Sequence, residues 1–390
     1  MFKEDHFFQE LTITRQKLHQ IPELSGKEYL TTQFIKNYLE TQGIRILDTQ
    51  LETGLVAEIG LNSGPIIGLR ADIDALPVQE ETQVAYQSQH KDVMHACGHD
   101  FHTASLLGAA KLLKEREQEL PGTIRLIFQP AEENFQGAKA VIETVAFDDW
   151  DALVGFHNSP TLPLGTIGHG EAKQTASVDR FFVTVRGTGT HAAHPEQGSD
   201  PIVTGAQMIT NLQAIISRHI PASEEAILSV THVKAGQTWN VIPDQFVFEG
   251  TIRTFNAQIR QQVHQLLERI VHNTADSYLQ TANVEWIIGP GSVENNVTLQ
   301  QTLTPSLTKV AREVLTLSPS LGGEDFAYYQ EHVPTYFAWI GTGTQIPLHH
   351  PAFSVDDQAL YYAVNYYLNA VETLLLQDDS LFNLKLNDKI

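Results

Sequence analysis

The chain has 390 residues, of which 42% are hydrophobic, and its 25 Lys and Arg against 46 Asp and Glu give a formal net charge of −21. This length suits two or three domains with a sizeable core, and the negative charge argues against binding to the phosphate backbone of nucleic acids. One Cys excludes an internal disulfide, no run of roughly 18 apolar residues predicts a membrane span, and the charged N-terminus lacks a signal-peptide pattern. We therefore expect a cytoplasmic globular protein.

Helical and strand patterns alternate through the first part of the chain. Helical periodicity is found in four segments, at residues 8–19, 29–39, 101–113 and around Val141. Short apolar runs predict four strands, at residues 55–59, 66–69, 124–128 and 152–156. This alternation indicates an α/β fold with a mostly parallel sheet.

The pattern changes near Val178. Six elements then follow in the order β-α-β-β-α-β, at residues 181–185, 200–219, 227–231, 246–252, 259–278 and 284–288. This order is typical of a ferredoxin-like module. The remaining segments are a helix at 299–317, a strand at 335–340, a helix at 359–375 and a polar, irregular tail at 377–390. The simplest account is a larger α/β domain, residues 1–176 and 290–390, into which a smaller domain, residues 177–289, is inserted.

Acidic and His side chains follow three predicted strands of the larger domain. They are Asp72 and Asp74, Glu132 and Glu133, and His157. Binding sites of parallel α/β sheets lie at the carboxyl ends of the strands. Any one cluster could be a solvated turn, and paired acids are also common at a helix start. Of two adjacent carboxylates, however, one can bind a metal while the other acts as general base on a metal-bound water.

The densest cluster of potential ligands surrounds the only Cys, in the segment MHACGHDFH at residues 94–102. Thiolate, imidazole and carboxylate are the side chains that bind divalent transition metals, and Gly98 allows a tight turn between Cys97 and His99. A nucleophilic Cys and a buried structural Cys are alternative interpretations. His349 and His350 form a further pair, of which one could be a ligand, although a pair on the surface is the simpler interpretation.

Six motifs occur in order along the chain: RADIDALP (70–77), MHACGHDFHTA (94–104), QPAEE (129–133), THAAHP (190–195), GTIRT (250–254) and GGEDF (322–326). Together they closely resemble the M20 metallopeptidase family. The resemblance is to its amidohydrolase branch, which includes N-acyl-amino-acid hydrolases, N-acetyldiaminopimelate deacetylases and auxin-conjugate hydrolases. It covers nearly the whole chain.

The resemblance implies a dinuclear metal centre. The matching ligands are Cys97, His99, Glu133, His157 and His349, with Cys97 bridging the two metals. Two divalent ions per subunit are implied, and the ligand types allow Mn²⁺, Zn²⁺, Ni²⁺ or Co²⁺.

The resemblance also implies catalytic and substrate-binding residues. Glu132 matches the general base, and Asp72 matches an acidic residue with a catalytic role in relatives. His191 is similar to the His that reaches a partner subunit's site and polarises the scissile carbonyl. Asn240 and Arg253 are similar to the pair that grips the substrate's α-carboxylate. The inserted domain is then a lid and dimerisation domain.

We therefore expect a dinuclear metal-dependent amidohydrolase that cleaves the amide bond of N-acyl, and specifically N-acetyl, amino acids. A metallo-dipeptidase or carboxypeptidase of the same family is the alternative. A metal-binding module without turnover and a cysteine hydrolase using Cys97 are two further hypotheses. The expected partners are a small N-acyl amino acid or short peptide and a second copy of the chain, with neither nucleic acid nor membrane.

Overall fold

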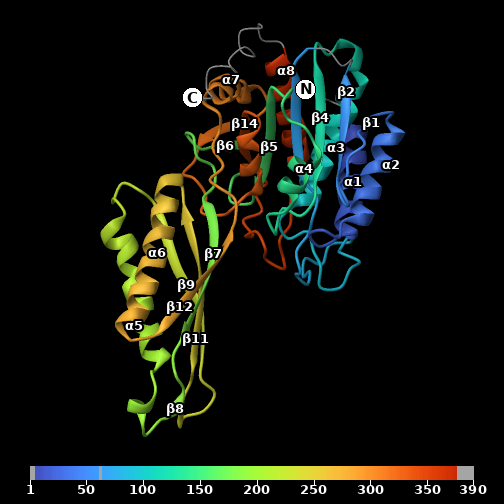
Figure 1. The fold of residues 1–390 in the computed structure, drawn as a ribbon. Coiled ribbons are helices and arrows are strands. Elements are labelled where there is room, and N and C mark those ends of the chain that lie inside the picture. The colour runs from blue at the N-terminus through green and yellow to red at the C-terminus, as the bar shows by residue number, and fades with distance from the viewer. Residues whose placement is uncertain (1–4, 61–63, 376–390) are drawn as a thin grey trace. The chain divides into compact units, whose positions relative to one another are not determined.

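A computed structural model describes residues 5–60 and 64–375 of the chain (Figure 1). Contacts within the chain divide it into two compact units. The larger unit comprises Met1–Gln174, Glu294–Ser318 and Asp325–Ile390, and the smaller one comprises Thr175–Val293 and Pro319–Glu324. The tail predicted at residues 377–390 lies outside the described residues.

The larger unit is built from alternating helices and strands. Its helices are α1 (Asp5–Gln20), α2 (Tyr29–Thr41), α3 (His99–Glu115), α4 (Gly137–Thr144), α7 (Val297–Ser306) and α8 (Ala359–Leu375). Its strands are β1 (Arg45–Ile46), β2 (Leu55–Gly60), β3 (Ile66–Asp72), β4 (Thr123–Gln129), β5 (Ala152–Ser159), β6 (Thr166–His169), β13 (Glu313–Thr316) and β14 (Thr335–Gly341). Short 3-10 turns cover Glu117–Glu119, Leu307–Lys309 and Asp325–Glu331.

The eight strands form one mixed sheet in the order β1-β2-β4-β3-β5-β14-β6-β13. The central strands β4, β3, β5 and β14 are parallel, whereas β1, β2 and β6 pair with antiparallel neighbours. Alternate residues of β14 point to opposite faces. Tyr336 and Ala338 join the core formed with the apolar residues of α1, α3 and α8, while Phe337 contacts Phe326 on the other face, with ring centroids 5.1 Å apart and planes tilted by 49°. Burial on both faces explains why these strands read as continuous apolar runs. The predicted α/β fold is confirmed.

One predicted helix of the larger unit is wrong. The pattern at 299–317 suggested a single helix, but α7 ends at Ser306 after Pro305, and residues 313–316 form β13. This strand pairs in parallel with β6, where Val314 faces Ile167. The backbone hydrogen bonds offered by the sheet edge therefore outweigh the helical propensity of the segment.

The smaller unit has the β-α-β-β-α-β order that the sequence predicts. Its elements are β7 (Ser177–Arg186), β8 (Thr190–His191), α5 (Pro201–Ala214), β9 (Ala226–Ala235), β10 (Val241–Ile242), β11 (Gln245–Thr254), α6 (Ala257–Ser277) and β12 (Thr281–Ile288). A 3-10 turn covers Pro195–Gln197, and α5 runs on into a π-helical turn at Ile215–His219. The long strands form an antiparallel sheet in the order β12-β7-β11-β9, and β8 pairs separately with β10. The helices α5 and α6 cover one face of the long sheet (Figure 1).

A buried carboxylate ties α6 to the sheet of the smaller unit. Asp179 of β7 is fully buried and accepts two hydrogen bonds from Arg260, at 2.7 and 2.6 Å, and one from His264 at 2.7 Å. Gly289 N donates a fourth at 3.2 Å. Burial alone would raise the pKa of Asp179, but the bonds from Arg260 and His264 outweigh it and lower that pKa below its usual value.

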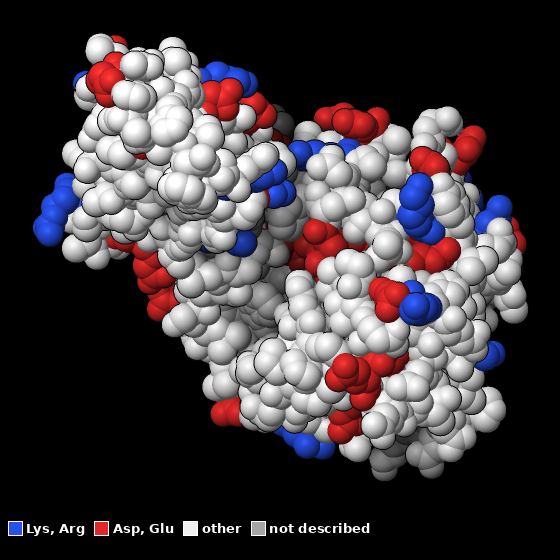
Figure 2. Space-filling model, turned by 90° about the horizontal axis from the view of Figure 1, so that it is seen from below, with Lys and Arg blue, Asp and Glu red and all other residues white. Residues whose placement is uncertain are grey.

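The surface fits the acidic composition. On the face in Figure 2, Asp and Glu residues are spread over the described surface, whereas Lys and Arg occur singly or in small groups and form no continuous basic patch there.

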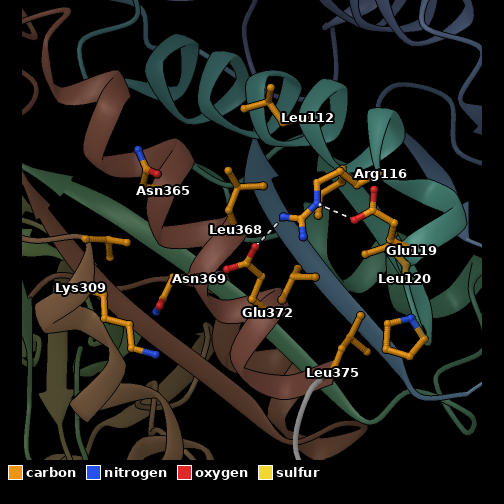
Figure 3. Close-up of a pocket in the computed structure, with 14 residues that line it drawn as sticks. Leu112, Arg116, Glu119, Leu120, Lys309, Asn365, Leu368, Asn369, Glu372 and Leu375 are labelled. Carbon is orange, nitrogen blue, oxygen red and sulfur yellow. Dashed lines mark hydrogen bonds and ion pairs between the residues drawn. The ribbon is translucent and has the colours of Figure 1, made fainter. Parts of the chain in front are cut away.

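A pocket of about 320 Å³ lies in the larger unit (Figure 3), where Arg116 pairs with Glu372 at 2.7 Å. None of the predicted site residues lines this pocket. Among the described helices, none is both long and apolar enough to cross a membrane.

We predict that Asp179→Asn lowers the free energy of unfolding of the protein by about 2–3 kcal/mol at pH 7, because hydrogen bonds to a charged group are lost. A carboxylate with a lowered pKa stabilises the fold above its unfolded-state pKa of about 3.9, and this contribution disappears as the pH falls through the folded-state pKa. Urea unfolding at pH 7 and near pH 3 measures the effect. The exposed Asp276→Asn on α6 is the control, and an equal loss of stability at both pH values would contradict the assignment.

Candidate metal centre

Parallel pairing brings residues from distant parts of the sequence to one edge of the large sheet. Asp72 at the end of β3 lies opposite Gln129 at the end of β4. His157, near the end of β5, lies opposite Trp339 of β14. The carboxyl ends of the central strands therefore meet at the same edge, as the sequence predicts.

Cys97 and His99 flank the start of α3. Gly98 between them has φ +86°, and a Cβ there would lie 2.5 Å from Asn158 Nδ2. Asn158 Nδ2 also donates to the Cys97 carbonyl at 2.6 Å. Only Gly can adopt this backbone conformation so close to the neighbouring side chain, and the turn therefore fixes both donors at the helix N-terminus.

Cys97 is shared by two groups of potential metal ligands. One group contains His99 and His157, and the other contains Glu133 and His349; in each, the donor atoms lie within 4.8 Å of one another. Cys97 Sγ is 3.4 Å from His157 Nε2 and 3.3 Å from His349 Nε2. Two ligands of one tetrahedral zinc ion lie roughly 3.4–3.6 Å apart. The spacing thus fits metal ligands, and Cys97 would belong to both groups.

The two carboxylates of the QPAEE motif lie in the turn after β4. Glu133 Oε1 is 3.9 Å from His99 Nε2 and 3.6 Å from His349 Nε2. Glu132 is 5% exposed and forms a third group of potential ligands with His99 and Glu133. Glu133 is therefore close to donors of both groups, and Glu132 lies beside it.

Asp74 connects the segment that bears His99 with the turn that bears Glu133. Its Oδ1 accepts a hydrogen bond from His99 Nδ1 at 3.0 Å, and its Oδ2 accepts from the Glu133 backbone N at 3.0 Å and from Ser25 Oγ at 2.7 Å. The bond to Nδ1 leaves His99 Nε2 free to face the donor cluster. This carboxylate–imidazole arrangement is the one that orients His ligands in metal sites.

Asp72 is fully buried and contacts His102 and Arg70. Its Oδ1 accepts from His102 Nδ1 at 2.6 Å, and its Oδ2 accepts from Arg70 Nη1 at 2.7 Å. His102 Nε2 in turn accepts from the Asn158 backbone N at 3.0 Å. Asp72 therefore holds the strand bearing His157 and Asn158 through His102, which is a positioning arrangement.

The buried donors carry strongly shifted pKa values. Burial alone would lower the pKa of His99, but the charge of Asp72 and the bond to Asp74 raise it to about 10. Burial raises the pKa of Glu133 to about 7. Burial, together with the charges of Glu133 and Glu132, raises the pKa of the Cys97 thiol well above its usual value. Such a cluster favours a divalent cation, which would stabilise thiolate and carboxylate together.

Two buried atoms that lack a hydrogen-bond partner also favour a bound metal ion. Among the described residues, His99 Nε2 and Glu133 Oε1 are buried without a hydrogen-bond partner. A buried polar atom without a partner is costly, and a metal ion would satisfy both. The raised pKa of Cys97 also argues against the cysteine-hydrolase hypothesis, because a nucleophilic Cys needs a lowered pKa.

His349 reaches the cluster from a loop far along the chain. Its backbone N donates to the Ala96 carbonyl at 2.8 Å, which ties this loop to the Cys97 segment. Its φ is +66°, an uncommon conformation for a residue other than Gly. Backbone strain of this kind concentrates at functional sites. The next residue, His350, donates no atom to any of the metal-ligand groups in the described chain.

The three remaining predicted residues lie in the smaller unit, at two separate places. His191 of β8 and Asn240 are neighbours, since Ala192 N donates to the Asn240 carbonyl at 3.1 Å and His191 pairs with Val241. Arg253 lies eight residues along β11 from Gln245, which is roughly 26 Å of extended strand. The structure therefore does not bring Arg253 to Asn240 within one chain.

Arg253 is half-buried, and its Nη1 donates to the Leu321 carbonyl at 3.3 Å. Burial lowers its pKa. In residues 5–60 and 64–375, no carboxylate forms an ion pair with it. Its guanidinium therefore keeps donors for an anion.

Sequence reasoning assigned no role to Asn158 or His102, although both lie beside the predicted ligands. Asn158 bonds to the Cys97 carbonyl and to His102, and His102 bonds to Asp72. His102 lies within the MHACGHDFHTA motif and Asn158 directly follows His157, but only the tertiary contacts distinguish them from ligands.

We predict that Asp74→Asn weakens divalent metal binding by about 10-fold to 100-fold, because the amide cannot accept all three hydrogen bonds that orient His99 and Glu133. Competition with a fluorescent chelator measures the affinity. The exposed Asp148→Asn removes the same charge and should bind metal like the wild type. Unchanged affinity in Asp74→Asn would show that Asp74 does not orient the ligands.

Relatives with known names cover nearly all of the chain. The N-acetyl-L-cysteine deacetylase of Bacillus subtilis (strain 168) is 47% identical over 362 residues, which cover 93% of this chain and 87% of that protein. A second N-acetylcysteine deacetylase of the same organism is 45% identical, covering 93% and 96%. An IAA-amino acid hydrolase of Arabidopsis thaliana is 33% identical, covering 97% and 89%.

A solved structure and a family model agree with these relatives. The crystal structure of the Bacillus subtilis YXEP protein, described as a dinuclear metal binding peptidase from the M20 family, matches with a TM-score of 0.86 and 42% identity, covering 95% of this chain and 99% of that one. The model of peptidase family M20/M25/M40 matches residues 68–373. The resemblance drawn from the six motifs is thereby confirmed, and the chain belongs to peptidase family M20/M25/M40, in its amidohydrolase branch.

Proposed function

We propose that this protein is a dinuclear metal-dependent amidohydrolase that removes the acetyl group from N-acetyl amino acids, with small sulfur-bearing amino acids among its substrates. The observation that carries the proposal is the Cys97 thiol shared by two ligand groups, with Glu132 buried beside them. The names of the two deacetylase relatives support the choice of N-acetyl substrates.

The ligand set would hold two divalent ions through Cys97, His99, Glu133, His157 and His349. When bound, such ions lower the pKa of a coordinated water towards about 7 and polarise a carbonyl. The protein's own contribution is proton transfer: Glu132 takes the proton from the attacking water and later delivers it to the leaving amine. Its position beside Glu133, in a buried turn, suits this exchange.

His191 would act as a hydrogen-bond donor to the scissile carbonyl. Its ring orientation supports this role, because Ala193 N donates to His191 Nδ1 at 3.0 Å and the proton must then lie on Nε2. A neutral imidazole with an exposed Nε2–H can stabilise the oxygen as negative charge develops on it.

Asn240 and Arg253 would hold the substrate's α-carboxylate from two copies of the chain. The separation of roughly 26 Å along β11 exceeds the span of an amino acid, so one chain cannot supply both. A homodimer formed through the smaller unit, which would act as lid and dimerisation domain, resolves the difficulty. Arg253 would bind the carboxylate with two parallel hydrogen bonds. The end of the smaller unit formed by β8, β10 and the turn between β9 and β10, here called the tip, bears His191 and Asn240 and would come from the partner. From the sequence, we place this dimer in the cytoplasm.

A metallo-dipeptidase or carboxypeptidase is the second candidate. The description of the YXEP protein as a peptidase favours it. Both reactions use the same donor cluster and general base, so the choice depends on the substrate pocket rather than on the chemistry.

We predict that Glu132→Ala lowers kcat by at least about 100-fold while both metals still bind, because the general base is lost and the proposed ligands remain. Steady-state kinetics and metal analysis of the same sample separate the two effects. The exposed Glu143→Ala on α4 should behave like the wild type. Activity near that of the wild type in Glu132→Ala would rule out its role as general base.

We further predict that a chelator abolishes activity and that Zn²⁺, Mn²⁺, Ni²⁺ or Co²⁺ restores it. The stripped protein should be assayed with each metal on N-acetyl-L-cysteine, N-acetyl-L-methionine, N-benzoylglycine and a dipeptide. Preferential hydrolysis of the N-acetyl substrates supports the deacetylase, and preferential hydrolysis of the dipeptide supports the second candidate. Activity that survives chelation would point to a cysteine hydrolase, and metal binding without any turnover to a non-catalytic module.

A further inference from the structure

We propose that Trp239 of one copy enters the active site of a second copy, beside His191 and Asn240, and contacts the apolar side chain of the substrate. The inference rests on the proposed function. It adds a residue that determines specificity for the amino-acid part of the N-acetyl substrate.

The first observation is the exposure of Trp239, whose surface is 92% accessible in the single chain. Trp is highly buried on average, and a fully exposed indole leaves a large apolar area in water. Val241, two residues on, is also exposed. Aromatic residues with this exposure are typical of contact surfaces, where Trp contributes much of the binding energy.

The second observation is the position of Trp239 in the turn between β9 and β10. It directly precedes Asn240, whose Oδ1 accepts from Thr238 Oγ1 at 3.1 Å and whose carbonyl accepts from Ala192 N. The pairing of β8 with β10 then places His191 opposite Val241. The indole thus belongs to the same tip as the two residues proposed to reach a partner's substrate.

The third observation identifies the second copy as the occupant. The tip lies beyond the Gln245 end of β11, whereas Arg253, the proposed carboxylate clamp, lies near the other end. A substrate held by Arg253 can meet Trp239 only if the tip comes from another chain. Trp239 adjoins Asn240, which is proposed to bind the α-carboxylate, so the amino-acid side chain is the apolar group within its reach. Sulfur contacts with aromatic rings are favourable, which fits sulfur-bearing substrates.

The test compares substrates with and without the side chain. In Trp239→Ala, kcat/KM for N-acetyl-L-cysteine and N-acetyl-L-methionine should fall relative to that for N-acetylglycine by about 2-fold to 10-fold. Trp239→Phe should retain most of the preference. Leu279→Ala, at a residue of the same unit that is 93% exposed, is the matched control and should leave the ratio unchanged. A wild-type ratio in Trp239→Ala would overturn the proposal.

Mixing variants tests whether the contact is made between copies. Hybrid dimers of Trp239→Ala with Glu132→Ala contain one site with an intact Glu132 that receives Trp239 from the other chain. The Trp239→Ala homodimers in the mixture stay active, so Glu132→Ala is added in large excess, which pairs nearly every Trp239→Ala chain in a hybrid. The substrate preference should then approach that of the wild type. A preference that stays at the Trp239→Ala value means that Trp239 acts within its own chain, and the proposal fails.

A second measurement keeps failure of the tip contact distinct from failure of the proposed function. If the wild type hydrolyses none of the N-acetyl substrates, the proposed function fails, and the contact is then judged by acrylamide quenching. The Trp239 signal, taken as wild type minus Trp239→Phe, should be protected at concentrations where the chain dimerises and accessible on dilution. Equal quenching at both concentrations overturns the contact.

Discussion

The carboxylate of Asp74 holds the donor cluster together. It accepts hydrogen bonds from the His99 ring, from the backbone of Glu133 and from Ser25, so that one buried side chain sets the position of three segments. Because the bond engages His99 Nδ1, the Nε2 atom must face the other donors. Both ligand groups depend on Asp74, since His99 belongs to one of them and Glu133 to the other.

The cluster is electrostatically unfavourable by itself and becomes favourable with a cation. Burial and the charges of the neighbouring carboxylates raise the pKa of the Cys97 thiol, and burial raises that of Glu133 to about 7. The fold tolerates this because a bound divalent charge would reverse both effects. Stability and metal binding are therefore expected to be coupled in this protein.

In the smaller unit, the length of the strands separates the proposed substrate-binding residues. Its sheet is held to α6 by hydrogen bonds from Arg260 and His264 to the buried Asp179. At one end of β11 lies the half-buried Arg253, and beyond the other lie His191, Trp239 and Asn240. The residues proposed to bind the substrate are thus separated by a strand length, a distance that a single chain of this geometry does not bridge.

The sequence by itself determined most element types and the family, and it supplied the candidate site residues, because apolar periodicity and short motifs are local signals. It failed at 299–317, where a sheet edge turned a helical pattern into β13, and it left Asn158 and His102 without a role. Only the tertiary structure decided which donors share Cys97, that Asp72 contacts His102, and that Arg253 and Asn240 lie apart. These facts depend on contacts between residues far apart in the chain, such as His349 with Ala96, and no local pattern specifies such distances.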